Sequence, residues 1–193
     1  MEELDGMESI VCKFGGTSLA DAEQIMKVRD ILQSDPNRKY VVPSAPGKRD
    51  SDDTKITDLL YLSHELSRQK VDFVDPFSRI RKRYSDLVDA LQVDLDIEAL
   101  LDTLQGEIAD DVSVDFVASR GEFLCGKLLA NLLDATFVDP ADTILFRSGG
   151  ELDTATYDVL GRCLSGDGVF VIPGFYGSDA HGEVRTFSRG GSD

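Results

Sequence analysis

The stretch IVCKFGGTSLADAEQ, residues 10–24, decides the fold class of this chain. An apolar run typical of a short, largely buried strand (9–14) ends in a lysine, two glycines and two hydroxyl residues, and a helical pattern then begins. Glycines let backbone N–H groups approach a ligand closely, and a helix that starts there adds the positive end of its dipole. The stretch therefore indicates a site where backbone amides meet an oxyanion; a glycine turn beside a surface lysine is the alternative.

The rest of the chain alternates helical and strand-like segments. Predicted helices span about 19–34, 54–69, 75–92, 95–109, 114–135 and 154–165, and predicted strands span 40–47, 136–140 and 168–175, with a hairpin after residue 175. Ser18 or Asp21 is expected to cap the first helix, and Pro43 is expected to mark a strand end or a bulge.

This alternation predicts an α/β fold with a mainly parallel sheet. In such sheets ligands bind beyond the carboxyl ends of the strands. We therefore expect the loops after residues 14, 42 and 173 to meet at one edge of the sheet and to carry the functional site.

Composition limits the classes of partner. The chain has 193 residues, of which 41% are hydrophobic, so it can bury a substantial core. Its net charge of −16 argues against nucleic acids and anionic membranes as partners. The short basic run RIRKR, residues 79–83, is interpreted as a solvated helix face. With no long apolar run and an acidic N-terminus, the chain is expected to be cytoplasmic.

Cysteine and histidine supply no recognisable site. Cys12, Cys125 and Cys163 are too few and too far apart for a disulfide framework or a metal site, and each is expected to be a small core residue in a reducing compartment. His64 and His181 are far apart in sequence and have no motif around them, so neither a metal site nor a histidine-based triad is expected.

Four short motifs occur in one order along the chain: KFGGTS (13–18), SRGE (119–122), GFYGS (174–178) and SRGGSD (188–193). Each is weak alone, but together, and with PSAPGK…KITDLLY (43–61), they resemble the aspartate kinases of the amino acid kinase family. The resemblance runs from about residue 8 to the last residue. It implies a three-layer αβα sandwich around an open, mainly parallel sheet. The Walker pattern of P-loop NTPases does not occur.

The resemblance also implies an organisation. Residues 1–193 would be the N-terminal, amino-acid-binding part of a catalytic domain. SRGGSD has the form of a loop that opens a helix, so we expect a C-terminally truncated chain without most of the nucleotide pocket and without the regulatory ACT domains. The full-length protein is expected to form a homo-oligomer.

The implied reaction is transfer of the γ-phosphoryl group of ATP to the side-chain carboxylate of L-aspartate, which gives 4-phospho-L-aspartate, the first step towards lysine, threonine and methionine. Mg²⁺ would accompany ATP, bound through its phosphates. The alternatives are an aspartate-binding fragment without turnover and a kinase for another acidic amino acid. Fusion of the parent protein to homoserine dehydrogenase is left open.

Phosphoryl transfer needs alignment and donors on the moving oxygens. By the resemblance, Lys13 and Asp193 are the catalytic residues, the lysine as a cation on the phosphoryl oxygens and the aspartate as its partner. Lys13, Gly15, Gly16 and Thr17 would hold the phosphates of ATP.

The substrate carries two carboxylates and an ammonium, which a guanidinium and an acid complement. The motif positions assign Arg189 to the α-carboxylate and Glu122 to the ammonium. The other expected substrate contacts are Ser44, Thr57, Phe175 and Ser192. Without the resemblance, Glu122 would be interpreted as an exposed helix acid paired with Arg120 or Lys127.

Overall fold

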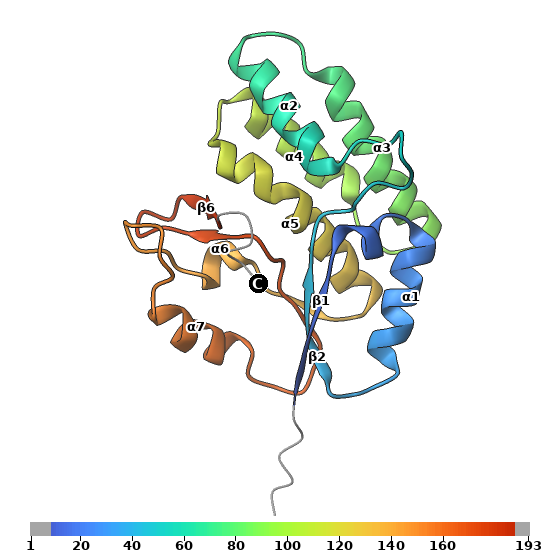
Figure 1. Ribbon diagram of the computed structural model, residues 1–193, viewed down its shortest axis with the longest axis vertical. Helices are drawn as coiled ribbons and strands as arrows, with labels where there is room; N and C mark the ends of the chain where they lie inside the picture. Colours follow the sequence, from blue (N-terminus) through green and yellow to red (C-terminus); the bar gives the residue numbers. More distant parts are fainter. Residues whose placement is uncertain (1–8, 188–193) are drawn as a thin grey trace, which may run out of the picture.

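The computed structural model describes residues 9–187 (Figure 1). Its main sheet has four strands in the order β1 (Ile10–Phe14), β2 (Arg38–Pro43), β4 (Phe170–Val171) and β3 (Thr136–Phe137), and every neighbouring pair is parallel. A separate antiparallel hairpin pairs β5 (Tyr176–Ser178) with β6 (Val184–Thr186). The α/β fold with a mainly parallel sheet, and the hairpin after residue 175, are confirmed.

Helices connect these strands. They are the 3₁₀ helix η1 (Gly16–Leu19) and the α-helices α1 (Ala22–Gln33), α2 (Ile56–Arg68), α3 (Val74–Leu91), α4 (Ile97–Ala109), α5 (Val114–Leu132), α6 (Pro140–Thr143) and α7 (Ala155–Cys163). Helices α2, α3 and α4 form a group at the top of Figure 1, above the sheet, and α7 lies on the lower left.

Helices lie on both faces of the sheet. Register pairs Cys12 with Val41 and Val41 with Val171, so these side chains share one face, and they pack in the main core with residues of α1 and α5. On the other face Tyr40 stacks on Phe170, and both pack near Leu164, which ends α7. This arrangement is the expected αβα sandwich.

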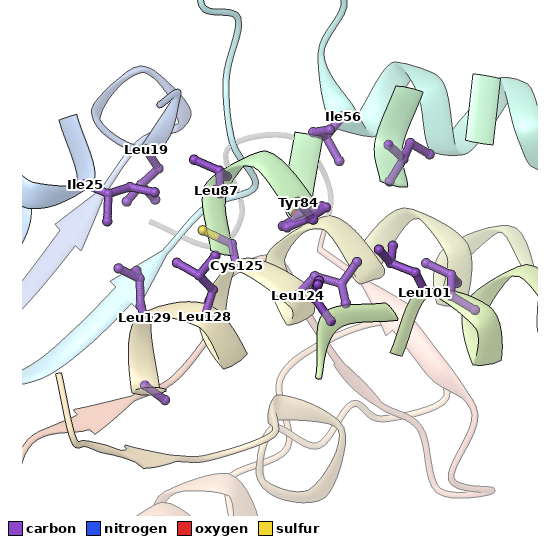
Figure 2. Packing of buried hydrophobic residues seen from close by; sticks show 14 of the residues in the cluster. Leu19, Ile25, Ile56, Tyr84, Leu87, Leu101, Leu124, Cys125, Leu128 and Leu129 are labelled. Carbon is purple, nitrogen blue, oxygen red and sulfur yellow. The ribbon is translucent and has the colours of Figure 1, made fainter. Parts of the chain in front are cut away.

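The main core joins α1–α5 to the sheet. Figure 2 shows side chains from these helices and from η1 gathered in one cluster, among them Leu19 of η1, Tyr84 and Leu124. The Tyr84 hydroxyl donates a hydrogen bond to the Gly121 carbonyl oxygen at 2.7 Å inside this core. Because α5 is fixed by α2, α3 and the sheet, side chains on its face toward the loops are held in defined positions.

The element ends follow local chemistry. The Asp21 carboxylate accepts a hydrogen bond from the Gln24 amide at 2.9 Å and caps α1, as one of the two predicted caps. The other candidate, Ser18, lies in η1, so α1 begins later than predicted. Pro43 is the last residue of β2, as expected. Strand β4 is shorter than the predicted 168–175 because Pro173 has no N–H to continue a ladder.

Two expectations about burial are wrong. Cys125 is buried and Cys12 is half-buried, but Cys163 is exposed because α7 buries only Thr156. The basic run on α3 is not a uniformly solvated face, since Arg83 is only 4% exposed. Among residues 9–187, no helix is both long and apolar enough to cross a lipid bilayer.

Candidate active site

Three loops meet at the carboxyl edge of the main sheet. The Ser44 amide donates to the Phe14 carbonyl oxygen at 3.0 Å, and the Gly174 amide donates to the Pro43 carbonyl oxygen at 3.2 Å. The segments that follow β1, β2 and β4 are therefore hydrogen-bonded neighbours. This confirms the expectation that the loops after residues 14, 42 and 173 come together.

A polar cavity of about 380 Å³ lies among these elements. It is lined by Gly16, Thr17, Ser44, Ala45, Pro46, Gly47, Lys48, Lys55, Thr57 and Glu122. These residues come from η1, the loop after β2, the first turn of α2 and the middle of α5. The structure thus brings together five of the predicted site residues: Gly16, Thr17, Ser44, Thr57 and Glu122.

Two glycines allow the loops that form this cavity to touch through their backbones. The Gly47 amide donates to the Gly16 carbonyl oxygen at 2.8 Å. A Cβ atom on Gly16 would lie 2.9 Å from the Ala45 carbonyl oxygen, and one on Gly47 would lie 2.6 Å from the Gly16 carbonyl carbon. Glycine is therefore required at both positions by the close approach of one loop to the other.

Glu122 lines the cavity and is buried, with 7% of its surface exposed. Burial raises the pKa of its carboxyl to about 7, and a backbone hydrogen bond at Ala45 and the charge of Arg120 offset this only in part. Its Oε2 atom has no hydrogen-bond partner within residues 9–187. The interpretation of Glu122 as an exposed helix acid is therefore wrong.

Two lysines of the cavity were missed by the sequence analysis. Lys48 and Lys55 line it together with Glu122, and both belong to the polar segment 47–55. The signal was available, because a charged loop with three basic and three acidic residues followed a predicted strand end. A cavity with two lysines, hydroxyl groups and one buried carboxylate suits a ligand that carries both anionic groups and a cation.

Other predicted residues lie elsewhere. Lys13 is exposed near the end of β1, in register with Val42. A Cβ atom on Gly15 would have no neighbour within 4 Å. Phe175 lines a second, largely apolar cavity of about 530 Å³ with Val11 and Val42. The structure leaves the roles of these residues as predictions, and Arg189, Ser192 and Asp193 lie outside the described residues.

Arg120 lies two residues before Glu122 on α5, and its side chain packs against aromatic rings. Its guanidinium lies 4.4 Å from the ring centroids of Phe116 and Phe123, and it donates to the Ser119 hydroxyl at 2.9 Å.

Within residues 9–187 no group of three or more histidine, cysteine, aspartate or glutamate side chains is placed to hold a metal ion.

Comparison with known proteins gives one consistent result. The profile described as the amino acid kinase family matches residues 8–193. The chain is 37% identical over 198 residues to aspartokinase 3 of Bacillus subtilis (strain 168), covering 95% of this chain and 44% of that protein.

Similar solved structures are also aspartate kinases. The crystal structure of Clostridium acetobutylicum aspartate kinase superimposes with a TM-score of 0.93 at 46% identity, over 96% of this chain and 43% of that one. E. coli aspartokinase III in complex with aspartate and ADP gives a TM-score of 0.75 at 26% identity, over 95% and 44%. The chain therefore spans less than half the length of each of these relatives.

Proposed function

Because this chain belongs to the amino acid kinase family, we propose that its polar cavity binds L-aspartate and that the whole protein transfers the γ-phosphoryl group of ATP to the side-chain carboxylate of that substrate. The product would be 4-phospho-L-aspartate, the first intermediate towards lysine, threonine and methionine. The relatives named as aspartokinases, one of them in complex with aspartate and ADP, support this choice within the family.

One observation supports the substrate assignment most strongly. The Glu122 carboxylate is buried in the cavity, and its Oε2 atom has no partner within residues 9–187. A buried acceptor without a partner is costly, and a charge-assisted hydrogen bond from an ammonium group would remove that cost. The site therefore suits an amino acid better than a simple dicarboxylate.

The other substrate groups have complementary neighbours. The hydroxyls of Ser44 and Thr57 line the same cavity as donors, and Lys48 and Lys55 supply positive charge for carboxylates. Arg189 for the α-carboxylate, with Ser192 and Phe175 as further contacts, remains part of the proposal.

Phosphoryl transfer itself asks for alignment and charge stabilisation rather than covalent help from the protein. Thr17 and Gly16 line the cavity, and Lys13 and Gly15 lie just before them on the same segment. We assign this segment to the phosphates of ATP, with Asp193 as the acidic partner of Lys13.

Mg²⁺ would be held mainly through the phosphate oxygens, because it usually keeps several waters and takes few protein ligands; when bound, it neutralises phosphate charge. A cytoplasmic location and a homo-oligomeric full-length protein belong to the same proposal.

The test is a calorimetric titration of the full-length gene product with L-aspartate, L-glutamate and succinate, which is aspartate without its ammonium group. We expect selective binding of L-aspartate, with succinate about tenfold or more weaker, because a charge-assisted hydrogen bond is lost. Glu122→Gln should bind L-aspartate and succinate equally weakly.

Glu107→Gln is the matched control, because Glu107 is a half-buried acid on α4 outside the cavity and should be dispensable for L-aspartate binding. Equal affinity of the unaltered protein for L-aspartate and succinate would contradict the role of Glu122. Absence of L-aspartate-dependent ADP formation in a coupled assay would contradict the kinase reaction.

A further inference from the structure

The basic run on α3 places one cation inside the protein. The Arg83 side chain is 4% exposed, whereas Lys82 beside it is 75% exposed. Removing a guanidinium from water is costly unless several acceptors replace the water. The hydrogen-bond acceptors that surround the Arg83 guanidinium therefore indicate the role of this residue.

From α3, Arg83 joins two segments that border the candidate active site. One guanidinium nitrogen donates to the carbonyl oxygens of Ala20 at 3.1 Å and of Gly47 at 2.9 Å, and the other pairs with the Asp53 carboxylate. Ala20 ends the turn that contains the two glycines, and Gly47 is part of the cavity wall. Asp53 lies near the other end of the loop 44–55.

Asp53 is itself fixed within its loop. Its carboxylate accepts hydrogen bonds from the Arg49 amide at 3.0 Å, from the Arg49 guanidinium at 3.0 Å and from the Thr54 amide at 3.0 Å. Burial alone would raise the pKa of Asp53, but the hydrogen bonds from Arg49 and the charge of Arg83 hold it well below its usual range. The carboxylate is therefore charged at neutral pH and remains paired with Arg83.

The contact is transmitted to the cavity through one residue. Gly47 donates its N–H to Gly16 at 2.8 Å and accepts from Arg83 on its carbonyl oxygen, so its backbone is held on both sides. Neither Arg83 nor Asp53 lines the cavity. Lys48, which follows Gly47, and Lys55, which lies two residues after Asp53, do line it.

We propose that the buried Arg83–Asp53 pair is a positioning device, which fixes the loop 44–55 against the turn of Gly15 and Gly16 and so aligns the cavity wall for phosphoryl transfer. The inference rests on the proposed function for its kinetic consequence. A guanidinium suits the task because its planar fork directs N–H groups at several acceptors at once, whereas a lysine ammonium is a compact point charge.

The kinetic test compares two arginines of the same helix in the full-length protein. Arg83→Met should lower kcat/KM for phosphoryl transfer to L-aspartate by about 100-fold, because misplacing a reacting group by about 1 Å costs that much. Arg81→Met is the matched control: Arg81 is paired with Glu98 and Asp102 of α4, away from the cavity, and its loss should leave kcat/KM within about twofold. Arg83→Lys should recover part of the loss.

The double variant Arg83→Met/Asp53→Asn separates positioning from simple stability. Arg83→Met removes one of the two guanidinium partners of the buried Asp53 carboxylate, leaving Arg49, and should lower Tm, whereas also neutralising Asp53 should restore part of Tm. We expect kcat/KM to stay low in the double variant, because the Gly47 carbonyl is still not held. Recovery of both Tm and kcat/KM, or an equal kinetic loss in Arg81→Met, would overturn the inference. If Arg83→Met does not fold, Arg83→Lys and the double variant give the same comparison.

Hydrogen exchange gives a readout that needs no activity. In the Arg83 variants the amides of segments 16–20 and 44–55 should exchange faster, while those of α4 stay unchanged; unchanged exchange in both segments would overturn the positioning role. If the unaltered protein transfers no phosphoryl group to L-aspartate, the proposed function fails, yet faster exchange at these two segments would still support the structural half of the inference.

Discussion

At the scale of single residues, the burial of the Glu122 carboxylate costs free energy, and binding of a cationic group in the candidate site would reduce that cost. Its carboxyl has a pKa of about 7 in the folded protein against an ordinary value of 4.5, and burial is the main cause. Holding this group charged in a buried place therefore opposes folding near neutral pH. A ligand cation at Oε2 would relieve this opposition.

The cost predicts a pH dependence. Because the folded pKa is raised, the folded state keeps the proton between pH 4.5 and 7 while the unfolded state releases it, so this group makes the protein less stable as pH rises through that window. The difference in unfolding free energy between Glu122→Gln and the unaltered protein should therefore change in favour of Glu122→Gln by about 2–3 kcal/mol when the pH rises from 5 to 8. Urea unfolding at several pH values measures this difference.

Glu98→Gln is the control for that series. Hydrogen bonds from Ser85 and Arg81 lower the pKa of Glu98, so removing its charge should give no gain at higher pH. A flat difference for Glu122→Gln across pH 5–8 would show that the Glu122 carboxyl titrates normally.

At the scale of elements, the site depends on contact between two backbones. The turn after β1 and the loop after β2 approach so closely that a Cβ atom on Gly47 would lie within 2.6–2.9 Å of three backbone atoms of Gly16 and Thr17. Backbone atoms cannot rotate away as a flexible side chain can. The two loops therefore form a rigid unit at the sheet edge.

This contact predicts different outcomes for two glycines. Gly47→Ala should lower the unfolding free energy by roughly 1–3 kcal/mol, because the new methyl group forces the loops apart. Gly15→Ala is the matched control: it has φ −76° and no neighbour within 4 Å of its Cβ position, so its stability should be unchanged or slightly higher. Thermal and urea unfolding measure both; equal stability of the two variants would mean that the loops yield easily.

At the scale of the whole molecule, the net charge of −16 sets a long-range repulsion. Most ion pairs of the described residues lie at the surface, as Lys27–Glu23 does, and such pairs contribute little. Repulsion among the excess carboxylates is therefore expected to outweigh the attraction within these pairs.

Salt should accordingly stabilise the protein. Raising NaCl from 0.02 to 0.2 M shortens the screening length and should raise Tm by about 2–4 °C, the effect of relieving about 1 kcal/mol of repulsion in a chain of this size. Choline chloride at equal ionic strength should give the same rise, which separates screening from specific ion binding. A falling Tm would mean that the surface pairs outweigh the repulsion.

The sequence alone determined the features that depend on neighbouring residues. Hydrophobic periodicity predicted the order of the longer helices and of the strands, but not the short helix α6. Asp21 was one of two predicted caps of α1, and Pro43 was expected to mark a strand end or a bulge. Because parallel strands end at the same sheet edge, it also indicated that the loops carrying Thr17 and Ser44 would meet. The local pattern was sufficient here because capping, turn formation and strand alternation act over a few residues.

Only the tertiary structure decided which side chains became buried. Arg83 lies on the apolar stripe of α3 between Ile80 and Leu87, a spacing that could have indicated its burial, but its acceptors Asp53 and Ala20 are 30 and 63 residues away in the chain. The burial of Glu122 and the exposure of Cys163 were likewise decided by which elements cover α5 and α7. Periodicity fixes the direction of a side chain around its helix, whereas its solvation, and hence its pKa and its partners, depends on distant segments that pack against that face.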